Sequence, residues 1–111
     1  MAYDTGLEAR IDESIQRASL QNLTKKKMFG GVGYLLSGNM TFGIWQDHLI
    51  VRCGLEHYEE YLDMDNVREF DITGRSMTGW IMVAPEGMEA DTDLEKWMTI
   101  GGDYAALLPP K

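Results

Sequence analysis

The chain has 111 residues, 44% of them hydrophobic and 25% charged, which is typical of a single globular domain covering residues 1–111. Its acidic net charge of −8 argues against direct nucleic-acid binding, because phosphate groups would be repelled at long range. A lone cysteine, Cys53, excludes an internal disulfide. The sequence shows neither the pattern of a signal peptide nor an apolar run of the ~18 residues that span a membrane, so we expect a cytoplasmic protein.

The first predicted element is an amphipathic helix over residues 5–23. Its apolar side chains recur at helical spacing on one face, at Leu7, Ile11, Ile15 and Ala18. We interpret the following Lys25–Lys27 run as the solvated end of this helix, where cations meet the negative end of the helix dipole. The alternative is a basic patch for nucleic acid, extended in space by Arg52 or Arg75.

Three strands are predicted next, over Met28–Leu36, Met40–Trp45 and His48–Cys53. A two-residue turn at Gln46-Asp47 would pair Trp45 with His48. Because side chains alternate along strands, this register places a wholly apolar set on one face, which we take as the core face. That set consists of Met40, Phe42, Ile44, Leu49, Val51 and Cys53.

The register of the first two strands depends on the turn between them. A two-residue turn at Gly38-Asn39 would place Gly31, Gly33 and Leu35 on the core face and Val32, Tyr34 and Leu36 on the reverse face. A three-residue turn would exchange the two sets, and the sequence leaves both registers open. In either register the reverse face keeps Trp45 and Ile50, so we expect a helix or a second subunit to cover it. The candidate interface of the expected homodimer is Val32, Tyr34, Trp45 and Ile50.

The remaining elements complete an α+β fold. They are a short helix over Leu55–Leu62, strands over Val67–Ile72 and Trp80–Ala84 joined by the Thr73–Gly79 loop, and a last helix from Asp91 or Thr92. Gly101-Gly102 is expected to break or bend that helix. The predicted order is α-β-β-β-α-β-β-α, a two-layer fold with a mostly antiparallel sheet of about five strands and helices largely on one face.

No arrangement of side chains predicts a metal site, a cofactor or a catalytic group. Cys53, His48 and His57 lack the paired spacing of zinc ligands. The spacing of Cys53 and His57 suggests a nucleophile and a base, but Cys53 falls on the apolar face, where cysteine usually acts as a small hydrophobic residue. We therefore expect no enzymatic activity.

Two glycine-containing segments depart from local propensity, which is frequent at functional or closely packed sites. The run Gly30-Gly31-x-Gly33 either gives room to the first helix, which would cross the strand there, or forms the floor of a ligand groove. Further along, Arg75 follows Gly74 in a loop. This arginine either pairs with Asp71, Glu69 or a chain terminus, or binds an anion through its guanidinium.

Four segments, in this order, resemble the TfoX N-terminal domain family. They are Lys27-Met28-Phe29-Gly30-Gly31-Val32-Gly33, Leu49-x-Val51-Arg52, Gly74-Arg75-x-Met77-x-Gly79-Trp80 and Leu108-Pro109-Pro110-Lys111. The resemblance runs from about Leu7 to the last residue and implies a compact α+β domain similar to the secretion chaperones. In longer members this domain precedes a second, helical domain, and those proteins regulate competence for DNA uptake. This chain would correspond to the first domain alone.

The resemblance implies no catalytic residues. Its characteristic positions, which we take as candidate binding residues, are Phe29, Gly30, Gly31, Gly33, Arg52, Gly74, Arg75 and Trp80. We expect a non-enzymatic regulatory or protein-interaction domain that forms a homodimer and whose protein partner the sequence does not name. The alternative function is a small-ligand or anion-binding module built on the glycine-rich strand, Arg52 and Arg75.

Overall fold

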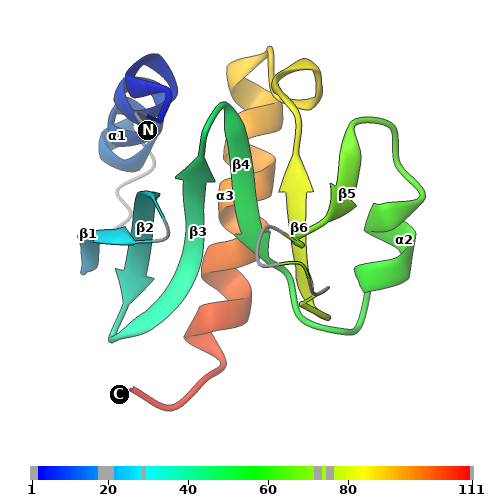
Figure 1. Ribbon diagram of the computed structural model, residues 1–111. Helices are drawn as coiled ribbons and strands as arrows, with labels where there is room; N and C mark the ends of the chain where they lie inside the picture. Colours follow the sequence, from blue (N-terminus) through cyan, green and yellow to red (C-terminus); the bar gives the residue numbers. More distant parts are fainter. Residues whose placement is uncertain (1–2, 18–21, 29, 72–73, 75–76, 111) are drawn as a thin grey trace.

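The computed structural model describes residues 3–17, 22–28, 30–71, 74 and 77–110. These residues confirm the α+β class, with three α-helices packed on one antiparallel sheet, although the sheet has six strands and not about five (Figure 1). The elements are α1 (Thr5–Arg17), β1 (Leu23–Met28), β2 (Gly31–Leu36), β3 (Asn39–Trp45), β4 (His48–Arg52), α2 (Tyr58–Leu62), β5 (Val67–Glu69), β6 (Trp80–Val83), the short 3₁₀ helix η1 (Pro85–Gly87) and α3 (Asp91–Ala106). Across the sheet the strands lie in the order β1-β2-β3-β4-β6-β5. The similarity to the secretion chaperones stays a prediction.

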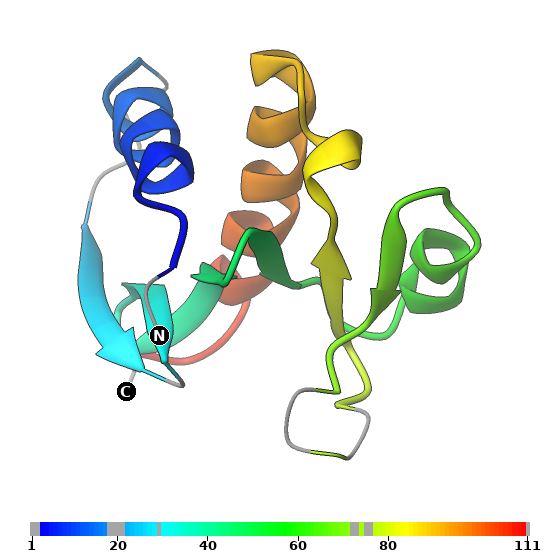
Figure 2. The ribbon, with the colours of Figure 1, turned by 45° about the horizontal axis from the view of Figure 1, so that its top comes forward.

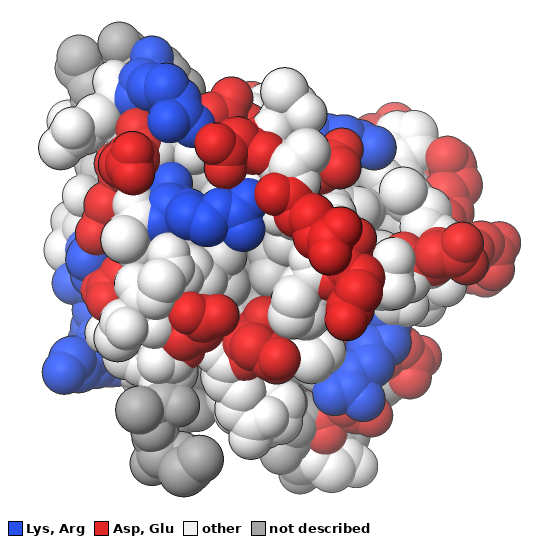
Figure 3. Space-filling model, turned by 90° about the horizontal axis from the view of Figure 1, so that it is seen from above, with Lys and Arg blue, Asp and Glu red and all other residues white. Residues whose placement is uncertain are grey.

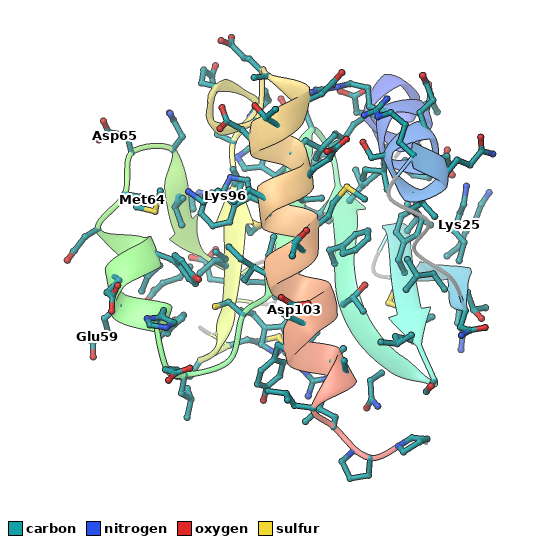
Figure 4. All side chains as sticks on the ribbon, turned by 180° about the vertical axis from the view of Figure 1, so that it is seen from behind. Lys25, Glu59, Met64, Asp65, Lys96 and Asp103 are labelled. Carbon is teal, nitrogen blue, oxygen red and sulfur yellow. The ribbon has the colours of Figure 1, made fainter. Side chains whose placement is uncertain are left out.

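One face of the sheet carries the main hydrophobic core, to which all three α-helices contribute. Helix α3 crosses this face, as Figure 4 shows from the helix side, and α1 packs beside α3. Ile11 of α1, Leu49 of β4 and Leu94 of α3 are fully buried between the layers. Burial of each such side chain stabilises the fold by ~1.5–3 kcal/mol. No helix in the described residues covers the opposite face, which faces the viewer in Figure 1 and is seen obliquely in Figure 2.

The lysine run lies in a strand, so its interpretation as a helix end is wrong. The described part of α1 ends at Arg17, residues 18–21 lie outside the described residues, and β1 pairs with β2 at the edge of the sheet. Lys25 Nζ lies 2.8 Å from Glu8 Oε2 and 3.0 Å from Asp12 Oδ2, both on α1. Lysine suits an edge strand because its charge discourages pairing with another chain. This residue also joins helix α1 to the sheet edge.

The strand predicted over Met28–Leu36 is the end of one strand and the whole of the next. Strand β1 ends at Met28 and β2 begins at Gly31. Between them, Gly30 has a φ of 77°, a left-handed conformation that glycine adopts readily. The sequence hides this turn because apolar residues continue on both sides of it.

The β3–β4 hairpin is confirmed in its predicted register, with Trp45 paired to His48. The turn between β2 and β3 lies instead at Ser37-Gly38, one residue before the predicted position, and pairs Leu36 with Asn39. Its φ values of 53° and 86° suit the type I′ turn that follows the twist of a hairpin.

The displaced turn gives β2 the faces expected from the alternative register, and not those of a turn at Gly38-Asn39. Val32 and Tyr34 pair with Ile44 and Phe42 and lie in the core, 0% and 2% exposed, so the prediction that they lie on the reverse face is wrong. The Tyr34 hydroxyl donates a hydrogen bond of 2.9 Å to Asp12 Oδ1. Burial, followed by this bond, raises the pKa of Tyr34 well above its ordinary value.

A β-bulge changes the place of one further residue. The register shifts between Tyr34 and Leu35, so Leu35 pairs with Met40 and Thr41 is the extra residue of β3. Met40 therefore packs against the reverse-face cluster and not in the core, contrary to the prediction. The Thr41 hydroxyl donates a 2.8 Å hydrogen bond to the Tyr34 carbonyl, which stabilises the bulge.

Helix α3 continues without interruption through Gly101 and Gly102, although a break or bend was predicted there. A Cβ atom at position 101 would overlap the Thr41 carbonyl of β3, whereas one at position 102 would meet nothing within 4 Å. Gly101 therefore lets the helix backbone approach the sheet closely. Strand β5 is also shorter than predicted, ending at Glu69, and Ile72 lies outside the described residues.

Candidate functional site

The helix-free face is the surface of the sheet opposite α1 and α3, and one row of cross-strand partners spans all six strands of it. In sheet order the row is Lys26, Gly33, Gly43, Ile50, Met82 and Arg68. A cation stands at each end of this row, and the residues between are glycine or apolar. The row defines which side chains the face offers to another molecule.

Large apolar side chains fill the centre of the helix-free face. Ile50 and Met82 are 0% exposed and Phe70 is 5% exposed, packed by the partly buried side chains of Met40, Trp45 and Trp80. The prediction that Trp45 and Ile50 share the reverse face is confirmed by the register. Among the described residues, neighbouring side chains of the same face cover Ile50, and no helix packs there.

Two paired glycines leave space at the centre of this face for methionine. Gly33 of β2 stands opposite Gly43 of β3. A Cβ at Gly33 would lie 2.8 Å from Met28 Sδ, and one at Gly43 would lie 2.8 Å from Met40 Cε. The glycines face away from α1, so the interpretation that the first helix crosses here is wrong. Flexible thioether side chains occupy the space, and such side chains adapt to varied surfaces.

Charged residues of the strands are distributed unevenly between the two faces of the sheet. Glu69 is the only acidic residue in the described strands, and it pairs with Ile81 on the core side. The helix-free positions of the strands instead carry Lys26, Arg52 and Arg68, in a chain with 18 acidic and 10 basic residues. This face is therefore a basic and apolar surface on an acidic protein.

The two arginines of α1 have carboxylate partners, whereas Lys96 of α3 lies over the Trp97 ring. Arg10 Nη2 lies 3.2 Å from Asp91 Oδ1, and Arg17 Nη2 lies 2.6 Å from Glu95 Oε2. Figure 3, which views the molecule from above, shows basic side chains set among acidic ones at that end. Helices α1 and α3 also carry more acidic than basic residues, which makes the charge of the helix-free face distinct.

At one end of the helix-free face, Arg52 contacts two aromatic rings. Its Cζ is 5.2 Å from the centre of the Trp80 ring and 5.5 Å from the centre of the Tyr104 ring. A guanidinium held over aromatic faces is stabilised by the quadrupole of each ring. The three side chains border a cavity of about 280 Å³, the Arg52 cleft. Its described lining residues are Arg52, Gly54, Leu55, Thr78, Gly79, Trp80 and Tyr104.

Backbone hydrogen bonds fix the floor of the Arg52 cleft. The Gly79 carbonyl accepts bonds from the N–H groups of Cys53, at 2.9 Å, and Gly54, at 3.0 Å. These bonds join the chain leaving β4 to the turn that enters β6. A Cβ at Gly54 would overlap the Tyr104 ring, so glycine is needed for α3 to contribute this ring. The cleft is therefore built by segments that are distant in sequence.

Cys53 and His57 do not form a nucleophile and base. Cys53 is buried in the core cluster, as predicted, and burial raises the pKa of its thiol to about 11. His57 is exposed, with Nδ1 3.0 Å from Glu60 Oε1, and this hydrogen bond raises the pKa of His57. A thiol that stays protonated at neutral pH is a poor nucleophile.

The structure brings together two members of the predicted binding set, Arg52 and Trp80, which are direct cross-strand partners. Gly31 and Gly33 lie on β2, two strands away from β4, and Gly30 lies in the turn before β2. Gly74 is in an exposed loop, and Phe29 and Arg75 lie outside the described residues. The glycine-rich strand and Arg52 therefore lie on different strands of the sheet, and the anion site predicted from them together with Arg75 stays a prediction.

Sequence reasoning missed the remaining walls of the Arg52 cleft, which are Leu55, Thr78 and Tyr104. Tyr104 lies within the predicted last helix, and no pattern in the sequence relates it to the end of β4. Leu55 is 70% exposed and precedes α2, which begins at Tyr58 and not at Leu55 as predicted.

Two further properties of the described residues bear on function. Within them, no three side chains of the His, Cys, Asp or Glu type gather as metal ligands would. None of their helices has the length and apolar character needed to cross a membrane.

Comparison with known proteins identifies one family. The sequence model of the TfoX N-terminal domain matches residues 16–103, which is most of the chain. No curated protein and no solved structure gives a significant match. This family is generally non-enzymatic, and at the level of the family the match indicates a competence-related regulatory domain. The chain belongs to the TfoX N-terminal domain family.

Proposed function

We propose that this chain is a non-enzymatic regulatory domain that acts by binding an acidic segment of a protein partner on the helix-free face of its sheet. The observation that carries the proposal is the composition of that face, on which Trp45, Trp80 and Met40 lie among the cations Lys26 and Arg52. Aromatic residues, methionine and arginine are enriched in protein interfaces, and glutamate and aspartate are depleted.

The charge of the face supports an acidic partner. A chain of net charge −8 repels an acidic protein at long range, but the three cations of this face attract a segment that reaches it. A face-to-face homodimer would bring the same cations of both copies together, which opposes association. The homodimer expected from the sequence therefore stays a prediction, and we favour a different protein as partner.

The non-enzymatic part of the proposal is supported by the buried state of Cys53 and by its raised thiol pKa. Catalytic cysteines usually have a lowered pKa and partial exposure, so that the thiolate is available. Both histidines stand beside carboxylates, at 2.8 Å for His48 with Asp47 and 3.0 Å for His57 with Glu60, and not beside the thiol. These contacts explain the positions of the histidines without a reaction.

Photo-crosslinking in the native host tests the proposal. A photoreactive phenylalanine analogue replaces Trp45 on the helix-free face and, as a matched control, exposed Glu13 on α1. We expect a discrete adduct from position 45 and none from position 13, and the adduct should weaken when Lys26 and Arg68 are both changed to Glu. Equal crosslinking from both positions, or none from position 45, would contradict the proposal. An adduct with twice the mass of the chain would support the homodimer instead.

A further inference from the structure

The Arg52 cleft offers a positive charge that no Asp or Glu carboxylate of the described residues neutralises. The described residues include every Asp and Glu of the chain, and none of them forms an ion pair or a hydrogen bond with Arg52. Arg10 and Arg17, in contrast, each contact a carboxylate. Arg52 is only partly exposed, so part of its hydration is lost in the folded state. An acceptor supplied by a ligand would replace that hydration.

The two rings orient the guanidinium. Its Cζ lies over the faces of both Trp80 and Tyr104, at 5.2 Å and 5.5 Å. Among the described residues no side-chain hydrogen bond or ion pair uses the N–H donors of Arg52, so these donors stay available to an acceptor. A fixed, planar row of donors matches the two oxygens of a carboxylate. The aromatic walls also lower the local dielectric and strengthen such a contact.

The other walls limit which anion fits. Among the described lining residues Arg52 is the only basic one, and the cleft of about 280 Å³ also holds the exposed apolar side chain of Leu55. A doubly charged phosphate needs more donors than one guanidinium supplies, and it is repelled more strongly by the net charge of −8. A carboxylate attached to a small apolar group matches both the single cation and the apolar wall.

From this geometry, we propose that the Arg52 cleft is a binding site for a carboxylate group, held by the Arg52 guanidinium beside Trp80 and Tyr104. The carboxylate belongs to a ligand whose apolar part contacts Leu55. The cleft lies where β4 ends, β6 begins and α3 approaches its last turn (Figure 1). Arg52 and Trp80 also belong to the face of the proposed function, but the cleft lies at one end of that face, so carboxylate binding and partner binding can be tested separately.

Backbone NMR titration tests the inference with four probes: N-acetyl-Ala-Leu with a free carboxylate, the same dipeptide as an amide, isovalerate, and inorganic phosphate. We expect the free-acid dipeptide or isovalerate to shift the amide signals of Gly54 and Gly79 and the indole signal of Trp80. The amide should bind at least about tenfold more weakly, since it lacks the charged acceptor. A tighter dipeptide would identify a peptide end as the natural source, and a tighter isovalerate a small free acid.

Variants assign the contact to Arg52. Arg52→Gln should lose binding of the free acid. Arg52→Lys, which keeps the charge but not the planar donors, should weaken it at least about tenfold. The matched control Arg68→Gln removes an equal charge from the same face and should bind as the native protein does. If Arg52→Gln does not fold, the comparison of acid with amide on the native protein and the Arg52→Lys titration still decide the outcome.

Four results would overturn the inference: no binding of either carboxylate, equal binding of the amide, Arg52-dependent binding of phosphate at least as tight as that of the acid, or unchanged binding by Arg52→Gln. The crosslinking experiment at position 45 is independent of these titrations. If neither carboxylate binds but the adduct at position 45 forms, the carboxylate site is wrong and the proposed function stands. If a carboxylate binds but no adduct forms at position 45, the proposed function is wrong and the carboxylate site stands.

Discussion

Arg52 and Trp80 are direct partners across the β4–β6 ladder, and the guanidinium carbon of Arg52 lies 5.2 Å from the centre of the Trp80 ring. Neither residue belongs to the main core cluster. Their contact therefore lies outside the main core, and because Tyr104 of α3 also contacts Arg52, a double-mutant cycle is needed to isolate its contribution.

We expect the free energies of unfolding of Arg52→Met, Trp80→Leu and the double variant to be non-additive. The coupling should be about 0.5–1 kcal/mol, the range of a partly exposed cation–π contact. Urea denaturation of the four proteins measures it. Additive effects within experimental error would show that the two side chains are close without interacting favourably.

Gly101 and Gly102 should respond oppositely to the same substitution. In Gly101→Ala the new methyl group overlaps the Thr41 carbonyl, so we expect a loss of roughly 1–3 kcal/mol in unfolding free energy. In Gly102→Ala nothing lies within 4 Å of the new atom, and the higher helix propensity of alanine should add about 0.5–1 kcal/mol. Thermal and chemical denaturation of both variants provide the comparison. Equal effects would mean that α3 does not approach β3 as closely as described.

Lys25 should differ from its neighbour Lys26 in its effect on stability. Lys25 contacts Glu8 and Asp12 on α1, and replacing it with Met should lower the unfolding free energy by about 0.5–1 kcal/mol. The loss should shrink in concentrated salt, which screens the ion pairs. Lys26→Met, on the helix-free face, is the control and should change stability little. A loss that does not depend on salt would indicate lost packing of the lysine stem instead of lost charge.

The thiol of Cys53 should be protected from alkylation and should make stability depend on alkaline pH. Burial raises its pKa from the ordinary value of 9.0 to about 11, so the unfolded chain loses this proton at lower pH than the folded chain. The contribution of Cys53 is therefore fully present below pH 9.0 and is lost as the pH rises toward about 11. The difference between native and Cys53→Ala unfolding free energies should fall across this interval.

Iodoacetamide labelling at about pH 8 provides a second measurement of the same site. Native Cys53 should react much more slowly than the cysteine of the urea-unfolded chain, because little thiolate forms in the core. Rapid labelling of the folded protein, or a pH dependence that is identical in Cys53→Ala, would contradict the buried thiol.

The sequence predicts well those parts of the fold in which local patterns and tertiary packing agree. The β3–β4 hairpin has strict alternation on both strands, so that a one-residue slip would expose Ile44 and Leu49, and its register was predicted correctly. The β2–β3 hairpin lacks this constraint because Gly31, Gly33 and Gly43 have no side chains to place. Its register is set by Ser37, which adopts a positive φ that is uncommon for serine, and by the bulge at Thr41.

Strand β1 was missed for a different reason. Lys25, Lys26 and Lys27 have no apolar alternation, and their strand conformation depends on hydrogen bonding to β2 and on the acids of α1. Likewise, the sequence indicated Arg52 and Trp80 singly, but the ring of Tyr104 reaches them through the packing of α3 on the sheet. Contacts of this kind arise from the tertiary fold, and no local spacing encodes them.

The two borders of the sheet discourage its extension by another chain. On one side, β1 presents a lysine-rich strand, and on the other, β5 consists of three residues. A strand from another chain could add few hydrogen bonds at β5, and at β1 it would have to accommodate adjacent positive charges. Growth by edge addition, the route to fibrils and to many swapped dimers, is therefore disfavoured at both borders. An acidic protein with such borders can keep the partly exposed side chains of Met40, Trp45 and Trp80 available without polymerising through its backbone.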